Sequence, residues 1–256
     1  MLPGDRLRAD FAAAIDGVPA GLATAERICA ACVDLLQVDG ASISLVRAGS
    51  AFGTFGSSGE LSRRLDEYQF TFGEGPCLDA VRGAQPILVP DLEDPTEQRW
   101  PVYAGAVLGE GVHAVYALPV SISSACVGAL DLYRAEPGRL GEADLTGGLI
   151  AATLATLPLL DLISAATEQH AGPIGSDEGA WAELASLESV EVYQATGMVM
   201  VQLGVGAAEA LVRLRAHAFA RAMTANDLAW QIVRREYRFN ADSDIDERGH
   251  NSEDGA

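Results

Sequence analysis

Hydrophobic residues in the first 165 positions recur at two spacings, one helical and one extended. Apolar residues from Leu22 to Leu36 stand three and four apart, as on one face of an α-helix. Residues Ala41 to Val46 alternate in polarity, which is typical of a strand with one buried face. The same criteria predict strands at residues 41–46, 51–57, 87–89, 113–120 and 125–133, and helices at 22–36, 61–68, 101–108, 144–162 and from Pro76 onward. This order predicts an α+β domain with a mainly antiparallel sheet.

The pattern becomes purely helical toward the C-terminus. Residues 180–203 are mostly good helix formers, and Gly204 offers a natural stop. A second helix is predicted at about 207–222, and Thr224 with Asp227 resembles a capping box that opens a third. The sequence therefore predicts an all-α three-helix domain after the α+β domain.

Composition places the boundaries between these parts. Residues 166–178 are rich in linker residues, and residues 240–256 are acidic with almost no apolar content. We therefore expect an N-terminal arm or short helix at 1–19, an α+β domain at 20–165, a linker, a helical domain at 179–239 and a disordered acidic tail.

The helical region carries Ala-x-Gly-Met-x-Met, then Gln-Leu-Gly, Glu-Ala-Leu and Leu-Arg-x-x-Ala, and ends with a Leu-Ala pair. This arrangement resembles the ANTAR domain, a three-helix RNA-binding output module. The matching positions are Ala195, Gly197, Met198, Met200, Gln202, Leu203, Gly204, Glu209, Ala210, Leu214, Arg215, Ala218, Leu228 and Ala229. The resemblance implies binding to structured RNA through hairpin loops, whose unpaired bases expose their hydrogen-bonding edges.

The α+β region carries Phe72-Gly-Glu-Gly-Pro-Cys77, followed by Tyr116-Ala-Leu-Pro-Val120 and Gly128-Ala-Leu-Asp-Leu-Tyr133. These segments resemble a GAF domain, a small-ligand sensor fold, and GAF followed by ANTAR is an actinobacterial arrangement. The candidate pocket residues, each of which also suits a core position, are Phe55, Phe72, Cys77, Trp100, Tyr116, Leu118 and Leu130.

The sequence does not identify a ligand for the GAF-like region. Some GAF domains bind cyclic nucleotides, haem or bilins, but no residue set here selects one, so the cofactor is unknown. Haem would require an axial ligand, and His113 is the only histidine of this region. The alternative is a dimerisation platform without a ligand, and a homodimer is expected in either case.

Charge distinguishes the helical region from the rest of the chain. The formal net charge is −19, and every cation is an arginine. Acids and arginines are balanced at six each in residues 179–239, whereas acids exceed arginines 24 to 10 before that segment and six to one after it. Because attraction to phosphate supplies most non-specific affinity for nucleic acids, only this neutral segment suits an RNA-binding surface.

Within that segment, Arg213, His217 and Arg221 follow one another at intervals of four and share a helix face. Arginine binds phosphate bidentately and stacks on bases, and small side chains let RNA approach closely. The predicted RNA-binding residues are therefore Ala195, Gly197, Arg213, Arg215, His217 and Arg221. A regulator that binds duplex DNA is the alternative.

An enzymatic role is not expected, although one alternative stays open. A GAF family reduces free methionine sulfoxide through cysteine chemistry, and Cys77 with Cys126 could serve as a thiolate pair. Cys29 and Cys32 form an isolated CxxC in a helical pattern, without the further ligands that zinc requires. No metal site is therefore predicted.

No apolar run reaches the ~18 residues needed to cross a bilayer, and the N-terminus lacks a signal-peptide pattern. We expect a cytoplasmic protein without membrane association. The two resemblances together predict a signal-responsive regulator that antiterminates transcription by stabilising an antiterminator hairpin, with a GAF signal shifting the population competent for RNA.

Overall fold

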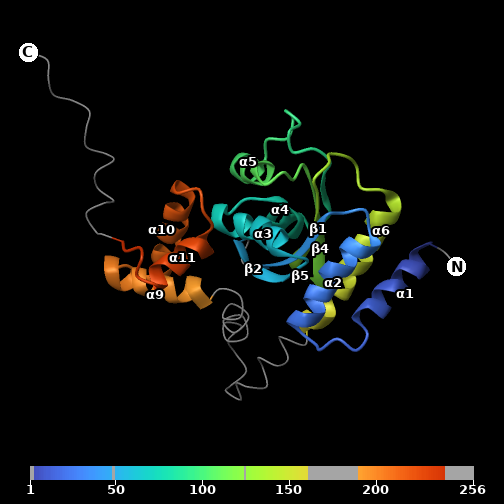
Figure 1. Ribbon diagram of the computed structural model, residues 1–256, viewed down its shortest axis with the longest axis horizontal. Coiled ribbons are helices and arrows are strands. Elements are labelled where there is room, and N and C mark those ends of the chain that lie inside the picture. The colour runs from blue at the N-terminus through green and yellow to red at the C-terminus, as the bar shows by residue number, and fades with distance from the viewer. Residues whose placement is uncertain (1–2, 48–49, 124, 161–189, 240–256) are drawn as a thin grey trace, which may run out of the picture. The chain divides into compact units, whose positions relative to one another are not determined.

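The computed structural model describes four segments of the chain: residues 3–47, 50–123, 125–160 and 190–239. It separates into two compact units, Met1–Glu188 and Ser189–Ala256, and each is described by itself (Figure 1). Three predicted features lie outside the described residues: the linker, the acidic tail and residues 180–189 of the first helix of the C-terminal domain.

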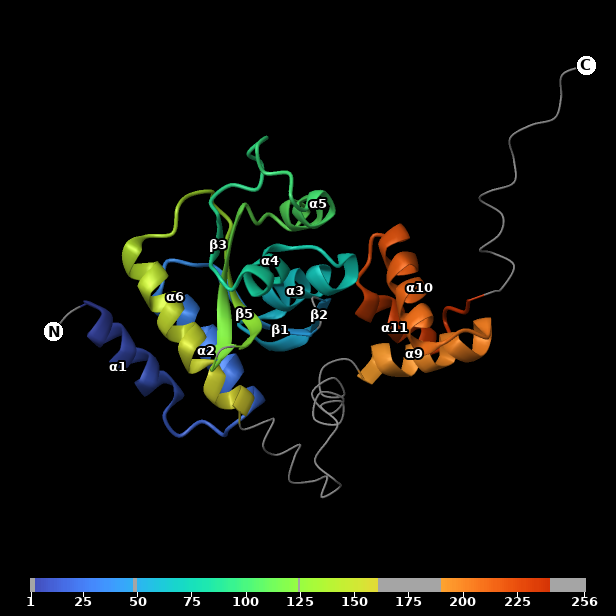
Figure 2. The ribbon, with the colours of Figure 1, turned by 180° about the vertical axis from the view of Figure 1, so that it is seen from behind.

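The N-terminal unit is built on a five-stranded sheet in the order β2-β1-β5-β4-β3, with every neighbouring pair antiparallel (Figure 2). The strands are β1 (Gly40–Arg47), β2 (Ser50–Ser57), β3 (Ile87–Val89), β4 (Ala114–Ile122) and β5 (Ala125–Arg134). The predicted α+β class and all five predicted strands are confirmed, with small differences at the strand ends.

Helices α2 (Leu22–Leu35) and α6 (Glu142–Leu154) cover one face of the sheet, and α1 (Pro3–Ile15) packs against both helices (Figure 1). The core between these layers includes the fully buried side chains of Leu118, Leu130 and Leu132. Phe11 of α1 is also fully buried in this core. The N-terminal residues therefore form a helix that belongs to the folded unit.

One continuous helical segment among the described residues, Glu142–Leu160, is long and apolar enough to span a membrane, with a mean hydropathy of 1.5. Two shorter helical segments reach this length and hydropathy only when they are counted as one span: Glu191–Leu203 and Ala207–Ala220. The chain bends by 103° between them. About two fifths (39%) of the most apolar window of Glu142–Leu160 is buried, and α6 packs on the sheet.

The opposite face of the sheet is covered by α3 (Glu60–Phe72), α4 (Pro76–Gly83) and α5 (Pro101–Gly109) (Figure 2). Glu74 precedes α4 in sequence but caps α5, because its Oε1 accepts hydrogen bonds from the N–H groups of Val102 at 2.8 Å and Tyr103 at 3.0 Å. A carboxylate at a helix N-terminus satisfies free N–H groups and favours the helix dipole. Glu74 therefore fixes the start of α5 relative to the turn before α4.

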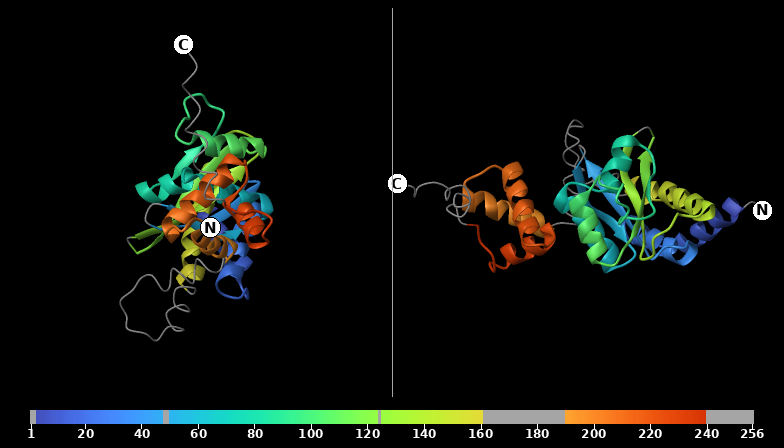
Figure 3. Two further views of the ribbon diagram at one scale, coloured as in Figure 1. Left: turned by 90° about the vertical axis from the view of Figure 1, so that its left-hand side faces the viewer. Right: turned by 90° about the horizontal axis from the view of Figure 1, so that it is seen from above.

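The described part of the C-terminal unit consists of α9 (Val190–Leu203), α10 (Ala207–Ala220) and α11 (Ala225–Val233) (Figure 3). The predicted capping box is present, since Thr224 Oγ1 accepts from the Asp227 N–H and Asp227 Oδ2 accepts from the Thr224 N–H. The core of this unit is formed by small and branched side chains that are fully or almost fully buried: Val192, Ala195, Val199, Ala210, Leu214, Ala218, Ala225, Leu228, Ala229 and Ile232.

Candidate functional site

The seven side chains predicted to line one ligand pocket lie on opposite faces of the sheet. Four belong to the core beneath α2 and α6: Phe55, Tyr116, Leu118 and Leu130. The other three lie beneath α3, α4 and α5: Phe72, Cys77 and Trp100. Side chains alternate between faces along a strand, so Leu118 and its partner Leu130 point away from the face of Asp131. The predicted set therefore does not form one pocket.

A cluster of buried polar side chains occupies the face beneath α3, α4 and α5. Asp131 of β5 is fully buried, and its Oδ2 accepts a hydrogen bond from Gln69 Nε2 of α3 at 2.6 Å. The Ser44 hydroxyl of β1 donates to Asp66 of α3 and lies 3.5 Å from Asp131 Oδ2. The Tyr133 hydroxyl lies at the same distance from that oxygen. We call Ser44, Asp66, Gln69, Asp131 and Tyr133 the carboxylate cluster.

Electrostatics favour a proton in this cluster. Burial, and then the charge of Asp66, raise the pKa of Asp131 to about 8, although hydrogen bonds from Gln69, Ser44 and Tyr133 oppose the shift. Burial also raises the pKa of Asp66 from its ordinary value. Two carboxylates that share a buried site cannot both ionise at low cost. The pair therefore retains a proton at neutral pH.

Gln69 joins the cluster to the glycine-containing turn that suggested a GAF domain. Its Oε1 accepts the Cys77 N–H at 2.9 Å, in the first turn of α4, while its Nε2 holds Asp131. Gly75 has a φ of 147°, and a Cβ atom there would lie 2.4 Å from Gln69 Oε1. Glycine at this position therefore supplies both the backbone conformation and the room for Gln69.

Two buried polar atoms at this site have no hydrogen-bond partner within the described part of the chain: Tyr103 Oη and Asp131 Oδ1. Tyr103 lies on α5, close enough that the charges of Asp131 and Asp66 raise the pKa of its hydroxyl, after the larger effect of burial. An unpaired buried polar group costs about 1–3 kcal/mol, so native proteins rarely leave one without a water or ligand. The two atoms mark a place where a polar molecule would gain hydrogen bonds.

No residue of the carboxylate cluster was among the predicted pocket residues. One signal was available, because Asp131 is a single acid within an apolar central strand and acids are almost never fully buried unless paired. Asp66 and Gln69 gave no such signal, since acids and amides are common on the exposed faces of helices.

The two cysteines of the reductase alternative differ in exposure. Cys77 is fully buried, and burial followed by the charges of Asp131 and Asp66 raises the pKa of its thiol well above the ordinary value. Cys126 is partly exposed at the start of β5. Because the thiolate is the reactive form and reactive cysteines have lowered pKa values, this environment disfavours Cys77 as a nucleophile.

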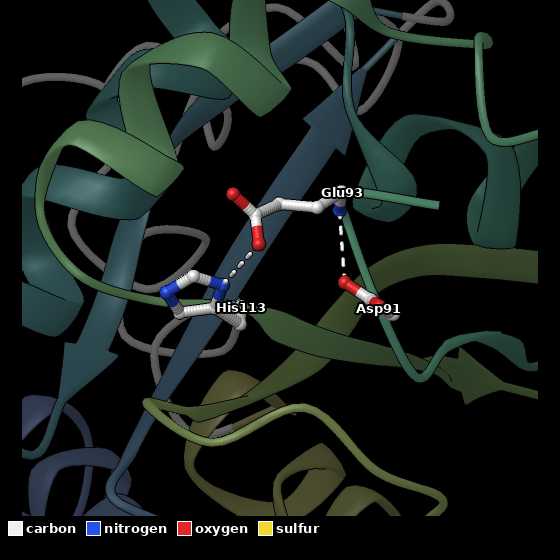
Figure 4. A group of neighbouring side chains, drawn as sticks. All are labelled: Asp91, Glu93 and His113. Carbon is white, nitrogen blue, oxygen red and sulfur yellow. Dashed lines mark hydrogen bonds and ion pairs between the residues drawn. The ribbon is translucent and has the colours of Figure 1, made fainter. Parts of the chain in front are cut away.

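One group of potential metal ligands occurs among the described residues, at the ends of β3 and β4 (Figure 4). Donor atoms of Asp91, Glu93 and His113 lie within 4.8 Å of one another. His113 Nδ1 is 3.5 Å from Glu93 Oε2, and the Glu93 N–H donates to Asp91 Oδ1 at 2.9 Å (Figure 4). In this arrangement His113 faces Glu93, and Asp91 closes a turn with the Glu93 backbone.

In the C-terminal unit, the predicted RNA-binding residues do not share one surface. Ala195 is fully buried, which contradicts its prediction as a contact surface, whereas Gly197 is exposed. The reason is helical geometry, because residues two apart on an α-helix point about 200° from each other. Ala195 is therefore a core residue, and only Gly197 of this pair can meet a ligand.

The four predicted cationic side chains of α10 and its end make contacts within their own unit. Arg213 pairs with Glu209 at 2.7 Å, and burial lowers the pKa of Arg215. His217 Nδ1 lies 3.1 Å from the Tyr237 hydroxyl, and the Arg221 guanidinium lies 4.2 Å from the centre of the Tyr237 ring. His217 and Arg221 thus support the segment after α11 through Tyr237.

Comparison with known proteins identifies the family of the N-terminal unit. A profile of the GAF domain matches residues 23–157, which is more than half of the chain. No curated protein matches the chain. Among solved structures, the GAF domain of a phosphoenolpyruvate-protein phosphotransferase from Acinetobacter is similar at 12% identity, with a TM-score of 0.50, over 64% of this chain and 97% of that one.

Two further similar structures have lower TM-scores. The GAF domain of a phosphoenolpyruvate-protein phosphotransferase from Coxiella burnetii is 17% identical, with a TM-score of 0.48, over 66% of this chain and 96% of that one. A type II free methionine-R-sulfoxide reductase from Thermoplasma acidophilum is 13% identical, with a TM-score of 0.41, over 63% and 96%. At such identities a likeness concerns the fold alone. Through residues 23–157 the chain belongs to the GAF domain family, which points to a ligand-sensing or signalling role.

Proposed function

We propose that the chain is a signal-responsive regulator, and not an enzyme, in which the GAF domain senses a small polar molecule and the C-terminal three-helix unit binds structured RNA. The observation that carries the sensing half is the pair of fully buried atoms without a protein hydrogen-bond partner among the described residues, Tyr103 Oη and Asp131 Oδ1. Tyr103 belongs to α5 and Asp131 to the sheet that α5 covers, so a molecule bound to both atoms would link the helix to the sheet.

The chemistry of these atoms defines the ligand class. When Asp131 is ionised, its Oδ1 can accept from a donor such as an amino or amide nitrogen, and the Tyr103 hydroxyl can donate to an oxygen. A cationic group beside the carboxylate pair favours its ionised form and opposes the burial that raises the pKa of Asp131 to about 8. A cationic ligand would therefore release a proton on binding at neutral pH and bind more tightly as the pH rises toward 8.

Helix α5 is the element that ligand binding would move. It carries Tyr103, and its start is held by Glu74 and by the Trp100 Nε1–H, which donates to Asp79 Oδ2 at 3.1 Å. A ligand alters an equilibrium only through different affinities for two states, and a new link between α5 and β5 provides such a difference. We propose that a change in the position of α5 reports ligand binding to the rest of the protein.

The sensing half is tested by thermal-shift screening of the full chain against free amino acids and other small amino- or amide-bearing metabolites. Native mass spectrometry of molecules that co-purify with the protein guides the choice of panel. Tyr103→Phe should weaken binding of any hit about tenfold, the value of one buried hydrogen bond. Tyr116→Phe is the matched control on the other sheet face, where its hydroxyl donates to the Gly138 carbonyl. Equal losses in the two variants would contradict the site.

The RNA-binding half is supported by the resemblance of residues 179–239 to the ANTAR domain and by the charge pattern. Arg234, Arg235 and Arg238 are exposed after α11, in the only segment where arginines balance acids. The mechanism we propose is stabilisation of an antiterminator hairpin over a competing terminator, with the GAF signal changing the population competent for RNA. A homodimer would present two such units to paired hairpins.

Electrophoretic mobility assays separate this function from a DNA regulator. The full chain should bind paired short RNA hairpins more tightly than duplex DNA of equal length, with an affinity that falls as salt increases. Tighter binding to the duplex would instead support the DNA alternative.

The enzymatic alternative needs a separate assay, the thiol-dependent reduction of free methionine sulfoxide. We expect no turnover above that of Cys77→Ser, because the Cys77 thiol is buried and its raised pKa disfavours the thiolate. Turnover that is lost in this variant would establish a reductase and overturn the regulatory proposal for the GAF domain.

A further inference from the structure

Gly197 occupies the middle of α9 without a packing reason. It is exposed, and a Cβ atom built at this position would meet no atom within 4 Å. Glycine inside a helix costs about 1 kcal/mol relative to alanine. The unit would therefore be more stable with alanine at this position, and its own fold does not explain the glycine.

Gly197 lies in the floor of a groove of about 750 Å³ within the C-terminal unit. The floor is one face of α9, formed by residues three and four apart: Gln194, Gly197, Met198, Val201 and Gln202. Val201 is 85% exposed there, although Val192 and Val199 on the opposite side of α9 are buried in the core. Apolar side chains therefore project from both sides of α9, and the described residues bury only those on the core side.

The facing wall is the segment after α11, with Arg235, Tyr237 and Arg238. Three contacts hold this wall in place: the Phe239 N–H donates to Gln202 Oε1 at 2.9 Å, His217 contacts the Tyr237 hydroxyl, and Arg221 lies over the Tyr237 ring. The groove is thus closed from below by α9 and flanked by two guanidinium groups and an aromatic ring.

Arg235 is the second costly residue of this groove. Its φ is 62°, in the left-handed region where a side chain costs about 1–2 kcal/mol and where glycine is favoured. At this turn the chain has an arginine where glycine would be less strained, and at position 197 it has a glycine where alanine would be more stable. Both exceptions border one groove, and residues that cost stability in this way point to a function.

We propose that the groove lined by Gly197, Met198, Val201, Arg235, Tyr237 and Arg238 binds an unpaired nucleotide of the RNA. This inference rests on the proposed RNA-binding function and locates its site. The groove is within the 300–1,000 Å³ typical of small-molecule sites. Its apolar floor and Tyr237 accept the flat face of a base, the arginines at its edge accept phosphate, and the missing side chain at Gly197 leaves room.

The assignment gives new roles to two predicted contact residues. His217 and Arg221 are positioning residues, because both contact Tyr237 and hold the wall of the groove. Arg213 is outside this set, since it pairs with Glu209 on α10. Arg213 therefore provides the control for a general effect of positive charge.

The test measures fluorescence anisotropy of the full chain with a pool of labelled RNA hairpins that carry a randomised loop. Gly197→Leu, which extends a side chain into the groove, should weaken binding on the order of tenfold, as expected for one lost base contact. Arg235→Gly should weaken it about fivefold or more and reduce its dependence on salt. Arg213→Ala should change affinity less than either variant.

A folding readout on the same proteins separates a site from damage to the fold. Hydrogen exchange of α9 and α11 should show unchanged or greater protection in Gly197→Leu, because leucine favours the helix over glycine and a Cβ atom at this position meets no neighbour, and in Arg235→Gly, because the turn is relieved of strain. Weaker RNA binding by an equally or better protected protein supports the groove, whereas lost protection in both variants contradicts the structural argument.

The remaining outcomes distinguish the two levels of the proposal. A wild-type chain that fails to bind the hairpin pool overturns the RNA function itself. RNA binding that is insensitive to Gly197→Leu and Arg235→Gly retains that function but overturns the groove. If sedimentation shows that Gly197→Leu converts a dimer to a monomer while RNA affinity is kept, the groove holds a second copy of the chain, and the nucleotide assignment is wrong.

Discussion

The two units of this chain keep their polar chemistry in opposite places. In the N-terminal unit, Asp66 of α3 and Asp131 of β5 are both buried, and burial is the main cause of the raised pKa of each. In the described part of the C-terminal unit, Thr224 is the one buried polar side chain, and the arginines after α11 are exposed. The N-terminal unit therefore holds one pair of carboxyl groups away from water, whereas the arginines after α11 are presented to it.

The comparison separates two kinds of response. In a poorly solvated interior, a change in protonation or a new hydrogen bond is worth several times its value in water. Such a site responds to pH and to small molecules. Exposed guanidinium groups are screened by salt and attract polyanions over a distance, so their response is to ionic strength and to phosphate. This contrast fits a sensor joined to a nucleic-acid-binding unit.

The largest expected effect is on the N-terminal unit, from Gln69→Met. The substitution removes the shortest hydrogen bond to Asp131 Oδ2 and leaves the Cys77 N–H without its partner, and breaking a buried polar network of this kind costs on the order of 3 kcal/mol of unfolding free energy. Hydrogen exchange should show lost protection in β5 and unchanged protection in α10. Gln98→Met, at an exposed glutamine, is the control; equal protection in the two variants would show that the network contributes little.

The second prediction concerns pH. The pKa of Asp131 is about 8 in the fold against an ordinary value of 3.8, so between these values the folded chain holds a proton that the unfolded chain has released. Stability contributed by this group is therefore full at acid pH and declines as the pH rises toward 8. Asp131→Asn keeps the neutral shape and should unfold with roughly 1–3 kcal/mol more free energy than wild type at pH 8.

Chemical denaturation of both proteins across this pH range measures the difference. The two curves should converge as the pH falls below 3.8, where Asp131 becomes neutral in both the folded and the unfolded wild-type chain. Parallel curves over the whole range would mean that Asp131 does not change protonation on unfolding, and the contrast between the units would lose its electrostatic basis.

The smallest of these effects belongs to the C-terminal unit. Thr224→Ala removes one half of the capping box and should lower the stability of α11 by about 1 kcal/mol. Exchange protection of α11 is the readout, and it should not depend on pH, because the cap replaces no buried charge. Thr224→Ser keeps the hydroxyl and should recover most of the loss; a serine variant as unstable as the alanine variant would exclude the side-chain cap as the cause.

Much of the fold could be predicted because its signals are local. The apolar runs of β4 and β5 and the Thr224–Asp227 pair each lie within a few residues, and the structure has those elements. Helical spacing also sufficed to separate Ala195 from Gly197, yet the prediction treated them as one surface and was wrong for Ala195. Periodicity assigns residues to faces, but only if each face is followed separately.

The sequence by itself determined the succession of helices and strands, the Thr224–Asp227 cap and the uneven distribution of charge, because these depend on neighbouring residues and on composition. Tertiary structure decided which side chains meet. Gln69 and Asp131 are 62 positions apart, and α9 meets the chain after α11 across 37 positions from Gln202 to Phe239. Contacts at such separations depend on how the sheet and helices pack, and local sequence patterns carry no record of that packing.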